Sequence, residues 1–335
     1  MSDPVDLSMN ETPYPPLPSV RRLVEQGAGQ LNRYPDHASK ALVGAIATHL
    51  DVPPEHVLVG PGSAGLCQHV LAGLDRTRGE VLHAALSFEA YPLLIANAGA
   101  RPVPVPMDGF RHDLAAIADA VTADTRAVLL CNPNNPTGAV LHRAEVETFL
   151  DRIPPDVVVV IDEAYREFVT DPDVPDGIDL YRGRDNVCVL RTFSKAYGLA
   201  TLRVGYAVAG ARVGAASRMA GMVFFPGGLG QAAAVASLAA DATAELATRL
   251  ADLAAERRWL AQALTGYGLP VAPSEANFLW LPLGDAATGF AQRLGEAGVL
   301  VRPYPGHGVR ITVGDRPANE RLLAAVRETT VSPVP

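Results

Sequence analysis

The stretch that decides the fold is VVVVIDEAY, residues 157–165. Its first five residues form an unbroken β-branched run, which is typical of a strand buried on both faces of a parallel sheet. A carboxylate, Asp162, follows at the carboxyl end of that strand, with Tyr165 on the same loop. Asp162 either caps the following turn or is a buried anion, and burial requires a cation or a donor beside it. A protonated heterocyclic nitrogen would be such a partner.

Similar short apolar runs, bounded by turn residues, lie on both sides of this stretch. The expected strands are Val57–Val59, Glu80–Ala84, Pro102–Pro106, Ala127–Cys131, Val157–Ile161, Val187–Leu190 and Val204–Ala209. Helix-compatible segments separate several of them, at Leu66–Leu74, Tyr91–Ala98, Leu114–Val121 and Ala144–Arg152. This alternation predicts an α/β domain in which a mostly parallel sheet is covered by helices on both faces.

The two ends of the chain have a different pattern. The Pro-rich segment Thr12–Pro18 cannot be regular helix or central strand, so we expect an extended arm. From Leu229 to Leu264 the residues are helix formers, and a smaller α+β unit with strands at Phe278–Pro282, Val299–Arg302 and Val309–Val313 follows. We therefore expect a large domain at residues 30–245, with residues 1–29 and 246–335 forming the N-terminal arm and the small domain.

Bulk composition excludes several classes of protein. The chain has 335 residues, of which 48% are hydrophobic and 19% charged, so it can bury a large core. Its net charge of −8 argues against a nucleic-acid partner. The start of the sequence is acidic where a secretory signal would be basic, and no apolar run reaches spanning length, so we expect a cytoplasmic protein without a membrane partner. Cys67, Cys131 and Cys188 suggest buried thiols, and the scattered histidines suggest no metal site.

Lysine occurs at two positions, Lys40 and Lys195, against 26 arginines. Lys195 lies in RTFSKAYG, residues 191–198, between an expected strand and a glycine turn. A lone lysine after a strand is commonly a solvated loop residue. An amine can, however, lose its proton and attack a carbonyl, which a guanidinium cannot do. The presence of lysine at this ordered position therefore favours a chemical role.

A glycine-rich turn, GPGSAG at residues 60–65, follows the strand Val57–Val59 and opens a helix. It matches the dinucleotide pattern G-x-G-x-x-G, but that pattern expects an acidic residue at the end of the second strand, and Glu80 stands at its start. A phosphate site remains, in which amides at the helix N-terminus and the Ser63 hydroxyl bind the anion. A tight structural turn is the alternative.

Three further groups suggest ligand oxygens. The turn NPNNPTG, residues 132–138, follows the strand that ends at Cys131, where α/β proteins bind ligands, so an asparagine amide is a candidate donor. Arg203 lies eight residues beyond Lys195, and Arg310 lies in GVRITVG, residues 308–314. Arginines mostly form surface ion pairs. Here each could bind an oxyanion through its planar fork, a phosphate for Arg203 and a substrate carboxylate for Arg310.

The order of these motifs resembles that of fold-type-I pyridoxal-phosphate aminotransferases, nearly end to end. The similarity is strongest to the histidinol-phosphate and aromatic amino-acid aminotransferase group, to which NETP at 10–13, NRYPD at 32–36 and VRITVG at 309–314 add further matches. The resemblance implies a seven-stranded sheet in the large domain and a homodimer with shared active sites. It also implies that Tyr34 reaches the phosphate site of the neighbouring subunit.

The resemblance also assigns roles within one subunit. Lys195 would bind the cofactor aldehyde, Asp162 would pair with the pyridinium nitrogen, and Asn135 and Tyr165 would hold the ring 3-oxygen. Phe88 would stack on the ring. The phosphate would be held by Ser63, the Ala64 amide, Thr192, Ser194 and Arg203.

GSAGLCQ at 62–68 and SFEAYP at 87–92 look like the aromatic, phenylalanine-type branch. We therefore expect transamination between an aromatic amino acid and a 2-oxo acid, with Arg310 binding the α-carboxylate near Asn135. Tyr14 and Phe224 are candidates to contact the aromatic side chain. MVFFPGG at 222–228 and ATL at 200–202 depart from the family pattern, which leaves open a specialised paralogue or a histidinol-phosphate aminotransferase. A decarboxylase or lyase, or a non-catalytic ligand-binding module, are the more distant alternatives.

Overall fold

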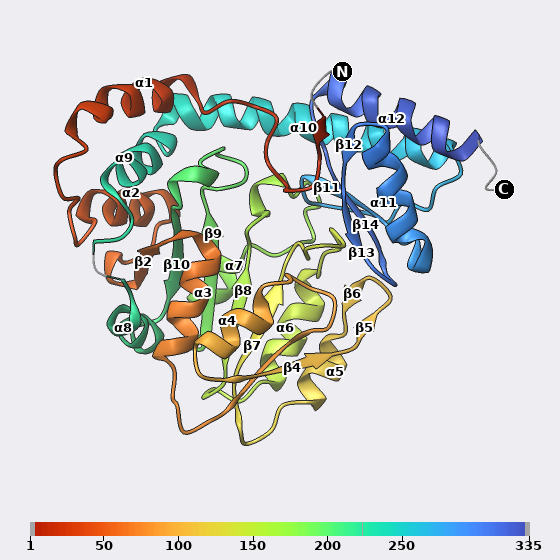
Figure 1. Ribbon diagram of the computed structural model, residues 1–335. Coiled ribbons are helices and arrows are strands. Elements are labelled where there is room, and N and C mark those ends of the chain that lie inside the picture. Colours follow the sequence, from red (N-terminus) through yellow and green to blue (C-terminus); the bar gives the residue numbers. More distant parts are fainter. Residues whose placement is uncertain (1–3, 223, 332–335) are drawn as a thin grey trace.

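The computed structural model describes residues 4–222 and 224–331. Its largest sheet has the strand order β2-β10-β9-β8-β7-β3-β4 (Figure 1). Only β10 runs antiparallel to its neighbours, so the expected mostly parallel, seven-stranded sheet is confirmed. The strands are β2 (Val57–Gly60), β3 (Glu80–Ala84), β4 (Arg101–Val105), β7 (Thr125–Cys131), β8 (Val158–Asp162), β9 (Val187–Thr192) and β10 (Gly205–Ala209).

Helices bury both faces of this sheet, which explains why its central strands are apolar throughout. Successive residues of β7 point to opposite faces. Ala127 and Leu129 belong to the core under α3 (Gly62–Gly73), α4 (Tyr91–Asn97) and α8 (Ala211–Ala220). Val128 and Leu130 belong to the core under α5 (Leu114–Asp119), α6 (Arg143–Arg152) and α7 (Gly177–Arg182).

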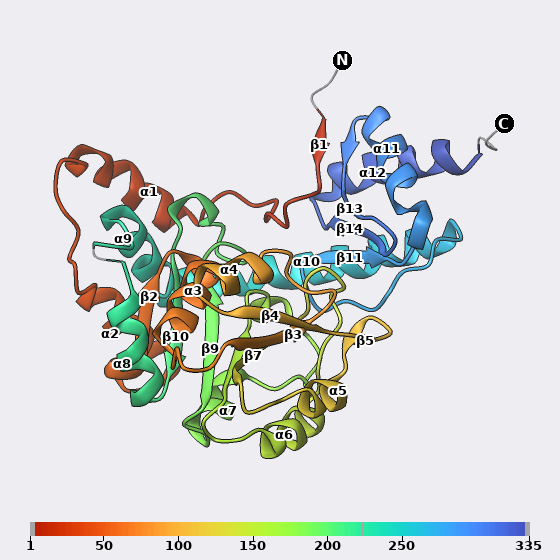
Figure 2. The ribbon, with the colours of Figure 1, turned by 60° about the horizontal axis from the view of Figure 1, so that its bottom comes forward.

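A second, antiparallel sheet has the order β11-β14-β13 and lies with α11 and α12 at the end of the molecule that holds both termini (Figures 1 and 2). The N-terminal strand β1 pairs in parallel with β12 beside it. The segment expected as one strand at Val299–Arg302 is divided between β12 and β13. The bounds are β1 (Val5–Asp6), β11 (Phe278–Leu281), β12 (Val299–Leu300), β13 (Arg302–Tyr304), β14 (Gly308–Thr312), α11 (Ala287–Glu296) and α12 (Arg316–Val331).

The N-terminal arm is not extended over its whole expected length. Pro18 begins the helix α1 (Pro18–Gly27), because the first position of a helix has no use for the amide hydrogen that proline lacks. This helix packs on α9 (Gly228–Ser237), as does α2 (Lys40–Leu50). The expected helical stretch from Leu229 to Leu264 is divided between α9 and the long helix α10 (Ala240–Gly266).

The expected domain boundary after residue 245 falls inside α10. This helix packs on α9 at one end and also on β11 and α12 (Figure 2). The division into residues 30–245 and 246–335 therefore stays a prediction. The remaining elements are β5 (Met107–Asp108), β6 (Arg111–His112) and the short 3-10 helices η1 (Ala28–Gln30), η2 (Pro54–His56), η3 (Arg166–Phe168), η4 (Ala200–Leu202) and η5 (Gly284–Ala286).

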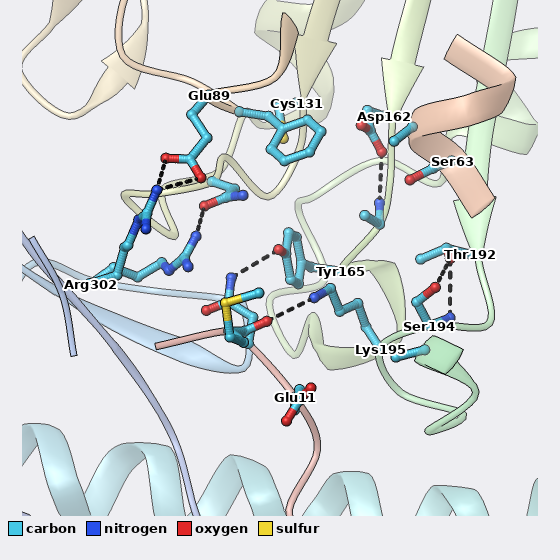
Figure 3. Close-up of a pocket in the computed structure, with 18 of the residues that line it drawn as sticks. Glu11, Ser63, Glu89, Cys131, Asp162, Tyr165, Thr192, Ser194, Lys195 and Arg302 are labelled. Atoms are coloured by element: carbon cyan, nitrogen blue, oxygen red, sulfur yellow. Dashed lines mark hydrogen bonds and ion pairs between the residues drawn. The ribbon is translucent and has the colours of Figure 1, made fainter. Parts of the chain in front are cut away.

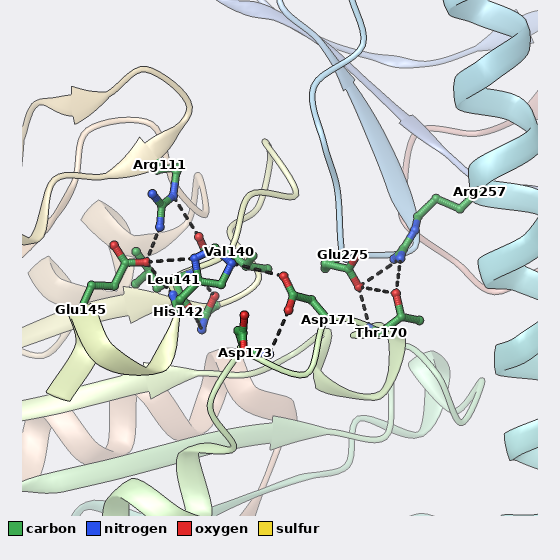
Figure 4. A network of polar contacts seen from close by, with 11 residues as sticks. Arg111, Val140, Leu141, His142, Glu145, Thr170, Asp171, Asp173, Arg257 and Glu275 are labelled. Atoms are coloured by element: carbon green, nitrogen blue, oxygen red, sulfur yellow. Dashed lines mark hydrogen bonds and ion pairs between the residues drawn. The ribbon is translucent and has the colours of Figure 1, made fainter.

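A polar network ties α10 to the loop after β8 (Figure 4). Arg257 of α10 donates through Nη1 to the backbone oxygens of Phe168 and Ala276, at 3.2 and 2.9 Å. Its Nη2 donates to Glu275 Oε2 at 3.1 Å, and the same oxygen accepts from the Thr170 amide at 2.6 Å. The network fixes the start of β11 against the sheet that carries Asp162.

The three cysteines are free thiols in buried positions, as expected. None of the helices in 4–222 and 224–331 combines the length and the apolar composition that a membrane span requires.

Candidate active site

The strands β2, β7, β8 and β9 end at one edge of the large sheet, and a pocket of about 360 Å³ lies there. Figure 3 shows it between that edge and the second sheet. Most of the residues predicted for the site line this one pocket, namely Ser63, Ala64, Phe88, Asn135, Asp162, Tyr165, Thr192, Ser194, Lys195, Arg203 and Arg310. The chain thus brings together side chains from five separate segments.

Lys195 follows β9 and is partly buried. Its Nζ donates to the backbone oxygen of Met9 at 3.1 Å. Burial lowers the pKa of Lys195 to about 8, helped by the charges of Arg310 and Arg203 and opposed by Glu11. An appreciable fraction of this amine is therefore uncharged near neutral pH, as a nucleophile requires.

Asp162 ends β8 and is 4% exposed. Its Oδ2 accepts from the Tyr91 hydroxyl at 3.0 Å and its Oδ1 from the Ala164 amide at 3.2 Å. Burial raises the pKa of Asp162 to about 6, although both hydrogen bonds act to lower it. The carboxylate is therefore both a cap for its loop and a buried anion. A cation in the pocket would stabilise it further.

Tyr165 and Asn135 face the same pocket as Lys195. The Tyr165 hydroxyl accepts from Asn10 Nδ2 at 2.9 Å, and burial raises its pKa. Lys195 Nζ lies 6.0 Å from the centre of the Tyr165 ring. Asn135 Oδ1 accepts from Arg310 Nη1 at 2.5 Å.

The other two asparagines of the turn at 132–138 have structural roles. Asn132 exchanges hydrogen bonds with the backbone of Leu141. Asn134 bonds to the Leu86 oxygen and to the hydroxyls of Ser87 and Thr137. Only one of the three asparagines therefore faces the ligand side, whereas the sequence suggested ligand binding for the turn as a whole.

The start of α3 forms an anion site. The helix has no side-chain cap, so its first amides are free to donate. Gly62 has φ +75°, and a Cβ there would lie 2.9 Å from Arg203 Nη2. Ser194 Oγ accepts from Arg203 Nη1 at 3.2 Å and from Thr192 Oγ1 at 2.9 Å. Amides, hydroxyls and one guanidinium together suit a phosphate.

Arg310 of β14 approaches from the second sheet and is 6% exposed. Besides Asn135 it binds the Tyr304 hydroxyl at 3.2 Å and the Ser8 backbone oxygen at 2.6 Å. Its Nε is buried and has no hydrogen-bond partner in the described part of the chain. A buried donor without an acceptor is costly, so this nitrogen suits a carboxylate ligand.

These features fit pyridoxal phosphate. The site offers a lysine of lowered pKa for the aldehyde and a buried carboxylate for the ring nitrogen. A glycine at the helix start leaves room for the phosphate. Phe88 lines the same pocket, as a residue that stacks on the ring must.

Three predicted residues lie outside the pocket of the single chain. Tyr14 packs under the guanidinium of Arg249, which lies 5.5 Å from its ring centre. Tyr34 is 85% exposed and Phe224 46%, and their rings contact each other at 5.1 Å between centres. Val223, which belongs to the unusual segment at 222–228, lies outside the described residues. The substrate roles of Tyr14 and Phe224 stay predictions.

Sequence reasoning missed other residues of the site. Asn10 contacts Tyr165, and Tyr91 contacts Asp162. Arg302 binds both carboxylate oxygens of Glu89 at 2.8 Å beside the pocket (Figure 3). Asn10 and Tyr91 lie within motifs that matched the resembled family, which was a usable signal. Arg302 carries no such signal.

The sequence and the fold were also compared with known proteins. The family described as Aminotransferase class I and II matches residues 2–326. The chain is 50% identical over 323 residues to the aromatic amino acid aminotransferase of Streptomyces coelicolor, covering 96% of this chain and 89% of that protein. The corresponding protein of Thermobifida fusca is 50% identical over 321 residues, with 96% and 89% covered. The crystal structure of histidinol-phosphate aminotransferase from Sinorhizobium meliloti in complex with pyridoxal-5'-phosphate superposes with a TM-score of 0.92 at 29% identity, covering 98% of this chain and 91% of that one.

Proposed function

The chain belongs to the aminotransferase class I and II family, and from this premise we propose that it moves an amino group between an aromatic amino acid and a 2-oxo acid. It is a pyridoxal-phosphate-dependent enzyme with the fold-type-I architecture. The observation that carries the proposal is the convergence of Lys195, Asp162 and Arg310 on one pocket.

Lys195 is proposed to bind the cofactor and then to move the proton. Its pKa of about 8 makes the amine available as a base near neutral pH. It takes the proton from the substrate Cα and returns it on the other side of the transfer. The bound pyridoxal ring supplies the electron sink for that step.

The groups around the ring are proposed to hold and polarise it. Asp162 keeps the ring nitrogen protonated, because a cation there relieves the cost of its own burial. Asn135 and Tyr165 bind the 3-oxygen, and Phe88 covers one face of the ring. The phosphate is held by Ser63, the Ala64 amide, Thr192, Ser194 and Arg203.

Arg310 is proposed to bind the α-carboxylate that both substrates share. Its unpartnered Nε and its planar fork support this role. An aromatic side chain is favoured because relatives at 50% identity are named aromatic amino acid aminotransferases. Histidinol phosphate is the second candidate, since the superposed S. meliloti enzyme is named for it, although at 29% identity.

A homodimer with shared sites is also proposed. Several apolar side chains are exposed on the single chain, and two of them, Tyr34 and Phe224, contact each other across 190 residues of sequence. Such a patch suits an interface with a second copy. The exposed group comprises Leu31, Tyr34, Met219, Met222 and Phe224. A cytoplasmic location stays a prediction.

The dimer proposal has a direct test. If Tyr34 completes the partner's site, mixing Tyr34→Ala subunits with Lys195→Ala subunits restores activity that neither variant has alone. Mixing that restores nothing, with dimer exchange confirmed by light scattering and mass analysis, would contradict the shared site.

The catalytic proposal is tested by half-reactions with single amino acids. Holoenzyme mixed with phenylalanine, tyrosine or histidinol phosphate is followed by cofactor absorbance, and the product acid is identified by mass spectrometry. We expect the aminated cofactor and an aromatic 2-oxo acid. A preference for histidinol phosphate would overturn the substrate. Release of CO₂ or elimination products without an aminated cofactor would overturn the reaction.

A further inference from the structure

Asn10 is the most completely bound polar residue near the pocket, and no role has been assigned to it above. It is 1% exposed and adopts φ 53°, a conformation that asparagine tolerates better than most residues. Its backbone oxygen accepts from Asn277 Nδ2 at 3.1 Å. Its backbone amide donates to Thr312 Oγ1 at 2.9 Å. The backbone is thus held from two sides before the side chain makes any contact.

The orientation of the Asn10 side-chain amide follows from Thr312. The Thr312 hydroxyl accepts from the Asn10 backbone amide, and its own proton goes to Asn10 Oδ1 at 3.3 Å. Asn10 Nδ2 is then left to point at the Tyr165 hydroxyl, 2.9 Å away. The reverse orientation would aim two donors at one threonine hydroxyl and place an oxygen beside Tyr165. The observed arrangement satisfies every group.

This orientation decides what the Tyr165 hydroxyl does. A phenol has one proton to donate, and Asn10 already donates to its oxygen. The Tyr165 proton is therefore free for an acceptor in the pocket. We infer that Asn10 is a positioning residue that keeps Tyr165 a hydrogen-bond donor toward the pocket. This rests on the proposed function, in which the acceptor is the 3-oxygen of the cofactor ring.

The same contacts connect Tyr165 to the strand that binds substrate. Thr312 and Arg310 stand two residues apart on β14, so their side chains lie on one face of that strand. Arg310 reaches Asn135, and Thr312 reaches Asn10. Both proposed ligands of the 3-oxygen are therefore held by β14. The ionisable groups around Tyr165 are Lys195, Asp162, Cys131 and Arg310, and the variants below leave all four in place.

Isosteric exchange at position 10 tests the inference. In Asn10→Asp a carboxylate replaces the donor and draws the Tyr165 proton away from the pocket. Loss of a donor to the 3-oxygen raises the pH at which the lysine–cofactor linkage loses its proton, by about one pH unit for one hydrogen bond. Asn10→Gly is the neutral control, because glycine accepts the positive φ. Its shift has the same sign and is smaller. The readouts are the pH titration of visible absorbance and the cofactor dissociation constant.

A double-mutant cycle separates positioning from added charge. In a Tyr165→Phe background the shift caused by Asn10→Asp should fall to less than half, since no phenol proton remains to redirect. An equal shift in both backgrounds overturns the inference. So does an Asn10→Asp variant that titrates like the wild type. A wild-type protein whose bound cofactor does not absorb in the visible range would instead count against the proposed function itself.

A second pair of variants covers the case in which Asn10→Asp does not fold. Thr312→Val removes the hydroxyl that orients the Asn10 amide, and Thr312→Ser keeps it. We expect Thr312→Val to shift the absorbance titration in the direction of Asn10→Asp, and Thr312→Ser to leave it unchanged. Equal titrations for the two threonine variants overturn the inference.

Discussion

Arg310 Nη1 lies 2.5 Å from Asn135 Oδ1, and the two residues are 175 positions apart in the chain. One belongs to β14 of the second sheet and the other to the loop after β7 of the first. The group proposed to bind the substrate carboxylate therefore directly contacts a group proposed to bind the cofactor ring. Substrate binding at Arg310 has a route to the ring through this hydrogen bond.

Arg310→Gln should lower kcat/KM by about 100-fold for amino and 2-oxo acids alike, because charge-assisted bonds to the shared carboxylate are lost. Arg302→Gln is the matched control, since Arg302 lines the same pocket but pairs with Glu89 near the solvent. Steady-state kinetics with both substrate classes measure the difference. Equal losses in the two variants would argue that Arg310 has no special role.

Lys195→Arg should lose about 1000-fold or more in kcat, since a guanidinium keeps the charge but cannot act as base or nucleophile. Lys40→Arg, at the exposed start of α2, should behave as the wild type. Borohydride reduction followed by peptide mass mapping should label Lys195 and not Lys40. Label found on Lys40 alone would refute the assignment.

Asp162→Asn should make the cofactor-free protein more stable above pH 6.5. The folded-state pKa of Asp162, about 6, lies above the unfolded value near 4, so stability falls as the pH rises between them. Asparagine removes this loss, about 2–3 kcal/mol at neutral pH. Thermal unfolding of cofactor-free protein at pH 4.5 and 7.5 should show the variant's advantage only at the higher pH. Cofactor affinity should fall in the same variant.

Gly62→Ala should weaken cofactor binding by about tenfold, because a Cβ 2.9 Å from Arg203 Nη2 displaces a phosphate ligand. Gly99→Ala is matched to it, with the same φ of +75° and no atom within 4 Å of the added carbon. Both variants should lose about 1–2 kcal/mol of stability from the left-handed backbone. Binding curves followed by cofactor fluorescence should separate them, and equal affinities would contradict the assignment of this cradle.

Arg191→Leu should destabilise the fold by about 3–5 kcal/mol, since it leaves a buried carboxylate without its cation. Arg191 donates through Nε and Nη2 to Glu163 Oε2, at 2.9 and 2.8 Å, and Glu163 is 1% exposed. Arg152→Ala breaks an exposed ion pair with Asp119 and should cost at most about 1 kcal/mol. Urea unfolding of both variants provides the comparison.

The sequence predicts the large sheet well because strands buried on both faces are apolar without interruption, as at residues 157–161. Lys195, Asp162 and Asn135 are predictable for a related reason, since each follows a strand at the edge where ligands bind. Helix α1 is not, because its first residue is the last of a proline run that favours extended backbone. Asn10 and Thr312 form their bonds 302 residues apart, and no local pattern reveals such a pair.

The pairing of β1 with β12 sets an order of events during synthesis. Val5 leaves the ribosome among the first residues, yet its partner Val299 is made near the end. The arm that covers Lys195 therefore stays unattached while the large sheet folds, and it docks only when the last strands emerge. A nascent chain should bind cofactor weakly until then, so that the reactive amine is enclosed in one late step.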